Sequence, residues 1–204
     1  MKDAIAERPV LINAGCGPSG AEHTPRLFEQ WRHLRVDVDP DVKPDVIADV
    51  TDMSALADNS ADALWTSHCI EHLYRHQVPL ALREFRRVLK NDGFAIIIVP
   101  DIQAVARYVA DDKLSDVLYE SSAGPITPHD VFFGLGTAVA AGNEHMAHKC
   151  AFTPKTLFEA LGAAGFPDFV IRRREKNLEL AAVARKTPWP NPDYRNALLD
   201  ALML

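Results

Sequence analysis

A glycine-rich segment followed by an acid is the part of this chain best suited to binding a nucleotide. The apolar residues 9–12 lead into Asn13-Ala14-Gly15-Cys16-Gly17 and on to Gly20, and glycine allows positive φ and close approach of a ligand. Asp37 follows Gly20 by seventeen residues, near the ~20 residues typical between a glycine loop and a ribose-binding carboxylate. The spacing predicts a ribose-bearing ligand with Asp37 as hydroxyl acceptor. Alternatively, Asp39 is the acceptor and Asp37 a turn carboxylate.

One group of histidines follows a short apolar run. His68, His72 and His76 are four residues apart, so a continuous helix would place them on one face. Such a face is a candidate metal site, but a capping and core role for Glu71 and His72 is the preferred interpretation. No metal ligand is therefore predicted.

Three further histidines, His129, His145 and His148, lie together in the second half of the chain. Histidine titrates near neutrality, so each is a candidate general base, as is His68. For each of the three, bracing of a loop or simple exposure to solvent is the alternative.

Apolar runs and helical spacing alternate through the first hundred residues. Apolar residues recur at helical spacing over 78–90, where 91–93 ends the helix as a C-cap. A helical stretch is also expected to begin at 67–73. The predicted strands are 9–14, 34–38, 45–48, 62–66 and 94–99, with a first, proline-broken helix over 21–33. This alternation predicts a doubly wound parallel sheet with helices on both faces.

The second half adds an insertion and the closing elements of one domain, 1–204. Residues 101–151 are predicted to form a lid-like insertion, with helices at 101–109 and 111–119, a loop at 120–130 and a helix or coil at 131–141. Thr153 is the expected N-cap of a helix ending near Ala164. Residues 169–174 and 178–184 predict an antiparallel hairpin, which completes a mostly parallel, seven-stranded sheet. In the tail, 187–204, the apolar end packs back or meets a partner.

Composition narrows the class of protein. The 204 residues carry a net charge of −6, which disfavours nucleic acid and anionic membranes as partners. Three scattered cysteines predict neither a disulfide framework nor a cysteine zinc site. No signal peptide or membrane-spanning run is recognised, so a cytoplasmic protein is expected, as a monomer or homodimer.

Four segments together resemble class I S-adenosylmethionine-dependent methyltransferases. These are Asn13–Gly17, Val36-Asp37-Val38-Asp39-Pro40, Asp49-Val50, and Asp58-Asn59-Ser60-Ala61-Asp62 leading into Ser67-His68-Cys69-Ile70-Glu71-His72-Leu73. The resemblance covers about residues 10–100, and 152–186 resembles the close of that fold. The short first helix resembles a bacterial subgroup of predicted small-molecule methyltransferases.

The resemblance implies a Rossmann-like methyltransferase fold and S-adenosylmethionine as cofactor, with S-adenosylhomocysteine as product. Asp37 would bind the ribose hydroxyls and Asp49 the adenine amino group. The full implied cofactor set is Asn13, Ala14, Gly15, Cys16, Gly17, Asp37, Val38, Asp49, Val50, Ser67 and His68. Val38 and Val50 would flank the adenine ring, while Ser67 and His68 would border the sulfonium.

The expected activity is methyl transfer to a small-molecule acceptor by in-line displacement, with the acceptor atom (N, O, S or C) left open. One alternative is an NAD-dependent oxidoreductase, because residues 15–20 also fit G-x-G-x-x-G. Another is a non-catalytic cofactor-binding or partner subunit of the same fold. A metal-dependent methyltransferase or hydrolase using the histidine cluster is a weaker alternative.

Overall fold

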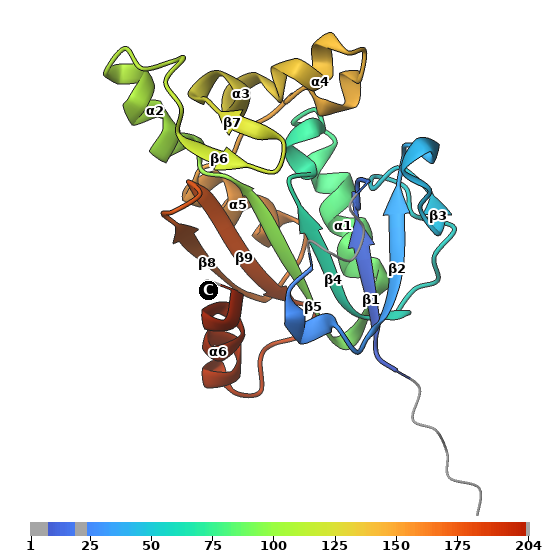
Figure 1. Cartoon of the computed structure of the whole chain (residues 1–204). Helices are drawn as coiled ribbons and strands as arrows, with labels where there is room; N and C mark the ends of the chain where they lie inside the picture. Colours follow the sequence, from blue (N-terminus) through green and yellow to red (C-terminus); the bar gives the residue numbers. More distant parts are fainter. Residues whose placement is uncertain (1–7, 19–23, 203–204) are drawn as a thin grey trace, which may run out of the picture.

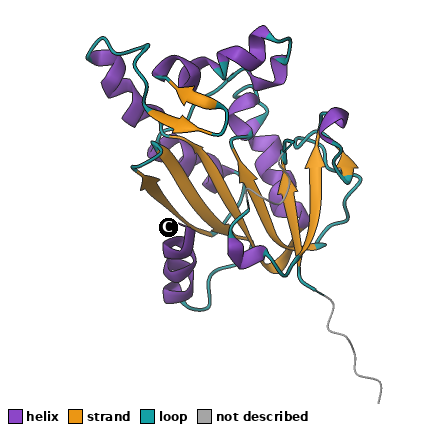
Figure 2. Ribbon diagram, in the orientation of Figure 1, coloured by secondary structure: helices purple, strands orange, loops and turns teal. Residues whose placement is uncertain are grey.

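A seven-stranded sheet is the centre of the computed structural model, which describes residues 8–18 and 24–202. The strand order is β3-β2-β1-β4-β5-β9-β8, as Figures 1 and 2 show. Neighbouring strands are parallel from β3 to β5, and β9 is antiparallel to both β5 and β8. The strands are β1 (Val10–Ala14), β2 (Arg32–Asp37), β3 (Val46–Ile47), β4 (Ala61–Ser67), β5 (Leu89–Pro100), β8 (Asp168–Arg174) and β9 (Glu179–Arg185). The predicted sheet and its closing hairpin are confirmed.

Two helices cover one face of the sheet. Helix α1 (Val78–Val88) places Leu82 and Phe85, both fully buried, against Ile12 and Ile97 in one core cluster. Helix α5 (Pro154–Ala163) adds further apolar residues to the same cluster. It begins at the predicted N-cap Thr153, whose hydroxyl accepts from the Thr156 amide in a capping box, and this satisfies an otherwise unpaired helix N–H group.

The other face is covered by a short 3-10 turn, η2 (Arg26–Phe28), and by α6 (Pro192–Leu202). Phe28 from η2 and Leu198 and Leu199 from α6 are buried in a second core cluster with Trp65 and Trp189. The tail therefore packs back on the sheet, which is the first of its two predicted alternatives. Among the described residues, no helix has both the length and the apolar character needed to cross a membrane.

Two helical predictions, for 21–33 and 67–73, are wrong. In the described part of 21–33, only η2 forms before β2 starts at Arg32, which pairs with Val10. Gly20 and residues 21–23 lie outside the described residues. The stretch 67–73 contains only the 3-10 turn η4 (Ile70–His72), and His68 has φ of +50°. His68, His72 and His76 therefore do not share a helix face.

Residues 91–93 are also not a helix C-cap, because α1 ends at Val88 and β5 has already begun at Leu89. The β4–β5 pairing shifts register between Ala61 and Ala63. A Cβ on Gly93 would lie 3.1 Å from three carbonyl oxygens there. The glycine therefore serves a close backbone approach at an irregular strand pair rather than a helix end.

The segment 101–151 lies above the carboxyl ends of the parallel strands in Figure 1. Its first predicted helix is present, but 111–119 is mostly turn, and the predicted loop 120–130 contains a small hairpin. The main chain returns to the sheet at a bridge between Asp101 and Phe152. The elements are α2 (Ile102–Ala110), β6 (Tyr119–Ser121), β7 (Gly124–Ile126), α3 (Pro128–Phe133), α4 (Gly136–Ala140) and η5 (Glu144–Met146).

Candidate active site

The glycine loop lies against the carboxyl end of β2. Gly15 and Gly17 have φ of +67° and +57°, in the region that favours glycine. The Gly17 amide donates to Asp37 Oδ2 at 2.8 Å, and the Asp39 amide donates to Asp37 Oδ1 at 3.0 Å. Each carboxylate oxygen can accept a further hydrogen bond. Asp37 is therefore held beside the loop with acceptor capacity left for a ligand.

Arg35, in β2, connects the glycine loop to the segment that follows β2. Its Nη2 donates to the Gly17 carbonyl at 3.1 Å and to the Val42 carbonyl at 3.0 Å, while Nη1 donates to the Lys43 carbonyl at 2.9 Å. The sequence analysis did not identify Arg35. A basic residue inside a partly buried strand, two positions before the predicted acid, was the available signal.

Cysteines support the loop rather than act as nucleophiles. Cys16 is buried next to the loop, and burial raises its pKa. Cys69 lies against Gly15, where a Cβ would be only 2.4 Å from the Cys69 sulfur. Burial also raises the pKa of Cys69, to about 12, so both cysteines remain thiols at neutral pH.

The remaining predicted adenosine contacts occupy the same edge of the sheet. Asp39 Oδ1 accepts from the Asp41 amide at 2.9 Å and caps the 3-10 turn η3 (Pro40–Val42). Asp49 is exposed, and one of its oxygens accepts from the backbone and hydroxyl of Thr51. Val38 is 43% exposed, whereas Val50 is buried. Asp37 and Asp39 thus each accept from the amide two residues on, and Asp37 also accepts from the glycine loop.

His68 follows Ser67, the last residue of β4, and lies between two carboxylates, those of Glu71 and Glu179. His68 Nε2 lies 2.8 Å from Glu179 Oε1, and Nδ1 lies 3.2 Å from Glu71 Oε1. Burial works to lower the pKa of His68, but these two carboxylates outweigh it and raise the pKa well above its ordinary value. A histidine that keeps its proton at neutral pH is a cation and hydrogen-bond donor rather than a general base.

Glu179 was missed by the sequence analysis, although it is an acid at the start of an otherwise apolar strand. It is 6% exposed, and its Oε2 accepts from Arg174 Nη1 at 2.8 Å. Because β9 pairs with β5, this residue reaches His68 across 111 positions of sequence.

The insertion histidines separate into two groups. His148 lies beside His72, with ring centroids 4.8 Å apart, and both lie near Glu71. His129 and His145 are exposed on other parts of the segment. Asn13 and Ala14 are buried in β1, behind the loop. The structure therefore brings His148, but neither His129 nor His145, to the edge where β4 ends.

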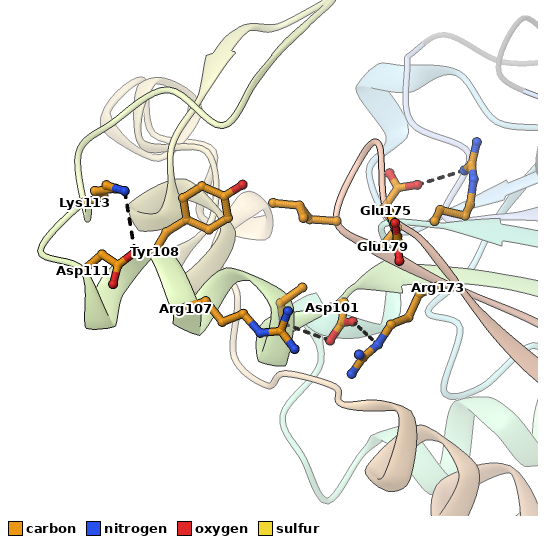
Figure 3. A pocket seen from close by; sticks show the side chains of 11 residues that line it. Asp101, Arg107, Tyr108, Asp111, Lys113, Arg173, Glu175 and Glu179 are labelled. Carbon is orange, nitrogen blue, oxygen red and sulfur yellow. Dashed lines mark hydrogen bonds and ion pairs between the residues drawn. The ribbon is translucent and has the colours of Figure 1, made fainter.

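A cavity of about 410 Å³ opens between α2 and the turn of the β8–β9 hairpin, as Figure 3 shows. Glu179 forms part of its wall, so the cavity adjoins the His68 cluster. Asp101, 1% exposed, lies 2.8 Å from Arg173 Nε on the same side. Arg107 and Tyr108, from α2, also line the cavity. The cavity therefore presents both signs of charge and an aromatic ring to a bound molecule.

Comparison with known proteins assigns most of the first half of the chain. Residues 12–97 match a family model described as a methyltransferase domain. A search of the curated proteins finds no match.

Solved structures resemble most of the chain. A SAM-dependent methyltransferase from Archaeoglobus fulgidus is 17% identical with a TM-score of 0.56, over 87% of this chain and 86% of that one. The 1,6-didemethyltoxoflavin-N1-methyltransferase of Burkholderia thailandensis, solved with 1,6-didemethyltoxoflavin and S-adenosylhomocysteine, is 20% identical with a TM-score of 0.52, over 89% and 72%. Human N-acetylserotonin methyltransferase, in complex with SAM, is 17% identical with a TM-score of 0.55, over 89% of this chain but 48% of that one.

At these identities, the solved structures establish the fold and the family model establishes the domain. Both agree with the resemblance found in the sequence and with the strand order of the sheet. The chain therefore carries a methyltransferase domain, built on the Rossmann-like fold of S-adenosylmethionine-dependent methyltransferases.

Proposed function

We propose that this protein transfers a methyl group from S-adenosylmethionine to a small-molecule acceptor by in-line displacement, leaving S-adenosylhomocysteine. The observation that carries the proposal is Asp37, held by the Gly17 amide where the glycine loop meets the end of β2. The sulfonium supplies an already activated methyl group. The protein's task is therefore to hold the donor and acceptor in line.

The described residues fit such a cofactor. No atom of a described residue lies within 4 Å of the position that a Gly17 Cβ would take, so the described part of the loop leaves room for a ligand there. In this proposal Asp37 accepts from the ribose hydroxyls, Asp49 accepts from the adenine amino group, and Val38 and Val50 flank the ring. The backbone of residues 13–17 lies along the methionine and ribose parts.

Ser67 and His68 border the methyl group in this arrangement, and the acceptor occupies the cavity beyond them. The size of that cavity, about 410 Å³, suits a small molecule. Segment 101–151 serves as its lid, since α2 forms one wall. A protonated His68 would orient a polar acceptor, and among the three insertion histidines His148 lies nearest this cluster.

Isothermal titration calorimetry of the purified protein with S-adenosylmethionine, S-adenosylhomocysteine and NAD tests the cofactor class. We expect both adenosyl ligands to bind and NAD not to bind. Binding of NAD alone, or of none of the three, would overturn the proposal. The match to a methyltransferase domain favours this outcome over the oxidoreductase alternative.

A methyl-transfer assay against a panel of small amines, alcohols, thiols and activated carbons separates an enzyme from a partner subunit. Turnover of any panel member supports the proposal. Tight binding of S-adenosylhomocysteine with no turnover across the panel would favour the non-catalytic alternative.

The ribose contact of Asp37 can be tested separately from its structural contact to the loop. We expect Asp37→Asn to weaken S-adenosylhomocysteine binding by about 10-fold or more, since charge-assisted hydrogen bonds are worth about 1.5–3 kcal/mol. The same substitution should matter little for a 2′,3′-dideoxy analogue, which lacks both hydroxyls. Asp41→Asn, at an exposed residue of η3 on the same edge, is the control.

Equal weakening of both ligands by Asp37→Asn would show that Asp37 acts only by holding Gly17. Asp39→Asn belongs in the same series. If the ribose-dependent loss follows Asp39 instead, the alternative acceptor is correct.

A further inference from the structure

Glu71, His72 and His148 converge next to the proposed acceptor site. Each offers a ligand atom, a carboxylate oxygen or a ring nitrogen, and these atoms all lie within 4.8 Å of one another. Glu71 and His72 come from η4, whereas His148 comes from segment 101–151. Small side-chain rotations would bring these atoms to the roughly 3–3.5 Å that separates ligands around a zinc ion with metal–ligand bonds of about 2.1 Å.

In both imidazole rings, Nδ1 lies against a backbone carbonyl oxygen and leaves Nε2 for a ligand. His148 Nδ1 lies 2.8 Å from the Val131 carbonyl oxygen, and His72 Nδ1 lies 3.2 Å from the Ala147 carbonyl oxygen. Because a carbonyl only accepts, each Nδ1 carries the proton and each Nε2 keeps its lone pair. A metal-binding histidine typically donates its other ring N–H to a carbonyl or carboxylate in this way.

Glu71 supplies a buried and incompletely satisfied carboxylate. It is 1% exposed, its Oε1 is paired with His68, and no described residue donates a hydrogen bond to its Oε2. The nearest cation is His68, whose Nδ1 lies 3.2 Å from Oε1 and whose other nitrogen is occupied by Glu179. Burying a carboxylate without hydrogen bonds is costly, and a metal ion would satisfy an oxygen that has no donor.

The backbone holds the three residues together. The Lys149 and Cys150 amides donate to the Glu71 carbonyl at 2.9 and 3.1 Å, which holds the irregular segment that follows His148 against η4. The Cys150 sulfur also donates, to the Ile70 carbonyl at 3.3 Å. A donor set of two imidazoles and one carboxylate, with the next position open, is typical of zinc and of other divalent transition metals.

We propose that Glu71, His72 and His148 form a binding site for a divalent transition-metal ion of the zinc type, which fastens segment 101–151 to the end of β4. This departs from the expectation that the chain has no metal ligand. That expectation rested on a capping and core role for Glu71 and His72, whereas the folded chain brings His148 next to both residues.

The test uses the full chain, stripped with a chelator and titrated with zinc chloride by calorimetry, without cofactor or acceptor. Its outcome therefore does not depend on the proposed methyl transfer. We expect one equivalent to bind and the melting temperature to rise with zinc concentration, as binding to the native state requires. Cobalt(II) substitution should give visible d–d absorption with nitrogen and oxygen ligands.

We expect zinc binding to weaken by about 100-fold or more in each of three variants, His148→Ala, His72→Ala and Glu71→Gln. Loss of a residue that only hydrogen-bonds to a metal ligand costs about 10–100-fold, and loss of a ligand itself should cost more. Glu71→Gln preserves side-chain shape, so it tests the site even if an alanine variant fails to fold. His145→Ala, at an exposed histidine of the same segment, should bind zinc like the parent.

Absence of zinc binding to the parent chain would overturn the proposal. So would undiminished binding in Glu71→Gln together with thiolate charge-transfer bands in the cobalt form, because the ion would then occupy the cysteines.

Discussion

Gly15 occupies a position where both its backbone conformation and its surroundings exclude a side chain. Its φ is +67°, and an added Cβ would lie 2.4 Å from Cys69 Sγ and 2.7 Å from Cys69 Cβ. Gly17 has a similar φ of +57°, but no atom of the described part of the chain lies within 4 Å of its Cβ position. A side chain at Gly17 would therefore meet only backbone strain, whereas a side chain at Gly15 would meet backbone strain and steric overlap with Cys69.

We expect Gly17→Ala to lower the free energy of unfolding by about 1–2 kcal/mol, the cost of a left-handed residue with a Cβ. Gly15→Ala should cost about 1–3 kcal/mol more, from overpacking against Cys69. Urea denaturation measures both values. In a double-mutant cycle, Cys69→Gly should recover the additional part; equal costs for the two glycine variants would contradict this account.

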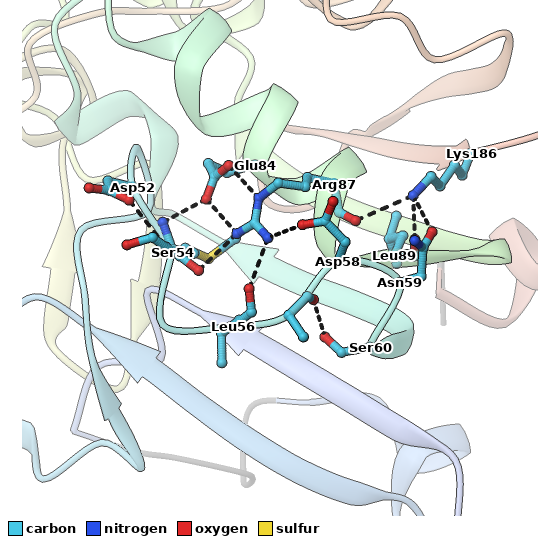
Figure 4. A network of polar contacts seen from close by, with 12 residues as sticks. Asp52, Ser54, Leu56, Asp58, Asn59, Ser60, Glu84, Arg87, Leu89 and Lys186 are labelled. Carbon is cyan, nitrogen blue, oxygen red and sulfur yellow. Dashed lines mark hydrogen bonds and ion pairs between the residues drawn. The ribbon is translucent and has the colours of Figure 1, made fainter.

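At the scale of elements, α1 and the loop that carries Asp49 are joined by Arg87, as Figure 4 shows. Its guanidinium donates to the carbonyls of Met53 and Leu56, both at 2.8 Å, and to both oxygens of Glu84. Glu84 Oε2 in turn accepts from the Met53 amide at 2.7 Å. A guanidinium suits this task because its donors form a rigid fork. One ion pair thus positions the whole loop between β3 and β4.

This ion pair predicts a pH dependence. The hydrogen bond from Arg87 lowers the pKa of Glu84 below its ordinary 4.5, against the opposing effect of burial. Because the folded-state pKa is the lower one, the stabilisation is present above about pH 4.5 and is lost as the pH falls through the folded-state value.

Glu84→Gln should therefore reduce the free energy of unfolding by about 1–2 kcal/mol at pH 7, and the difference from the parent should shrink toward pH 3. Urea titrations across that range measure it. Glu159→Gln is the control, since Glu159 is exposed and lies 3.9 Å from Lys155, and such a pair contributes about 0.5 kcal/mol or less. A difference for Glu84→Gln that does not change with pH would contradict the assignment.

At the scale of the whole molecule, α6 packs on a face of the sheet, away from the proposed ligand-binding edge. Helix α6 lies near the edge away from segment 101–151 in Figure 1. Leu199 is fully buried there in the second core cluster, and Arg195 holds the helix to Asp168 at 2.8 Å.

Leu199→Ala should lower the free energy of unfolding by about 2–4 kcal/mol, from lost burial and the cavity that remains. S-adenosylhomocysteine affinity should be unchanged at a temperature where the variant stays folded. Leu80→Ala, at a 43% exposed position of α1, should cost about 0.5 kcal/mol. Denaturant unfolding and calorimetry measure the two quantities separately, and a parallel loss of affinity would show that α6 supports the site.

The sequence alone determined the parts of the fold that depend on local order. Apolar runs marked the strands, Thr153 marked the start of α5, and the glycine segment with Asp37 marked the nucleotide-binding edge. These signals are short-range, because a strand, a helix cap or a tight turn is encoded by neighbouring residues. The same reasoning failed at residues 67–73, where helical spacing was outweighed by tertiary contacts.

Only the tertiary structure decided which distant side chains meet. His68 reaches Glu179 because β9 enters the sheet next to β5, and His72 reaches His148 because segment 101–151 folds back onto η4. Such contacts cannot be predicted from local sequence, because they depend on strand order and on how a long segment returns to the sheet. The sequence thus determined the fold and the cofactor edge. Packing of the whole chain decided the cavity beside α2 and the histidine–carboxylate cluster, because their residues are contributed by elements far apart in the chain.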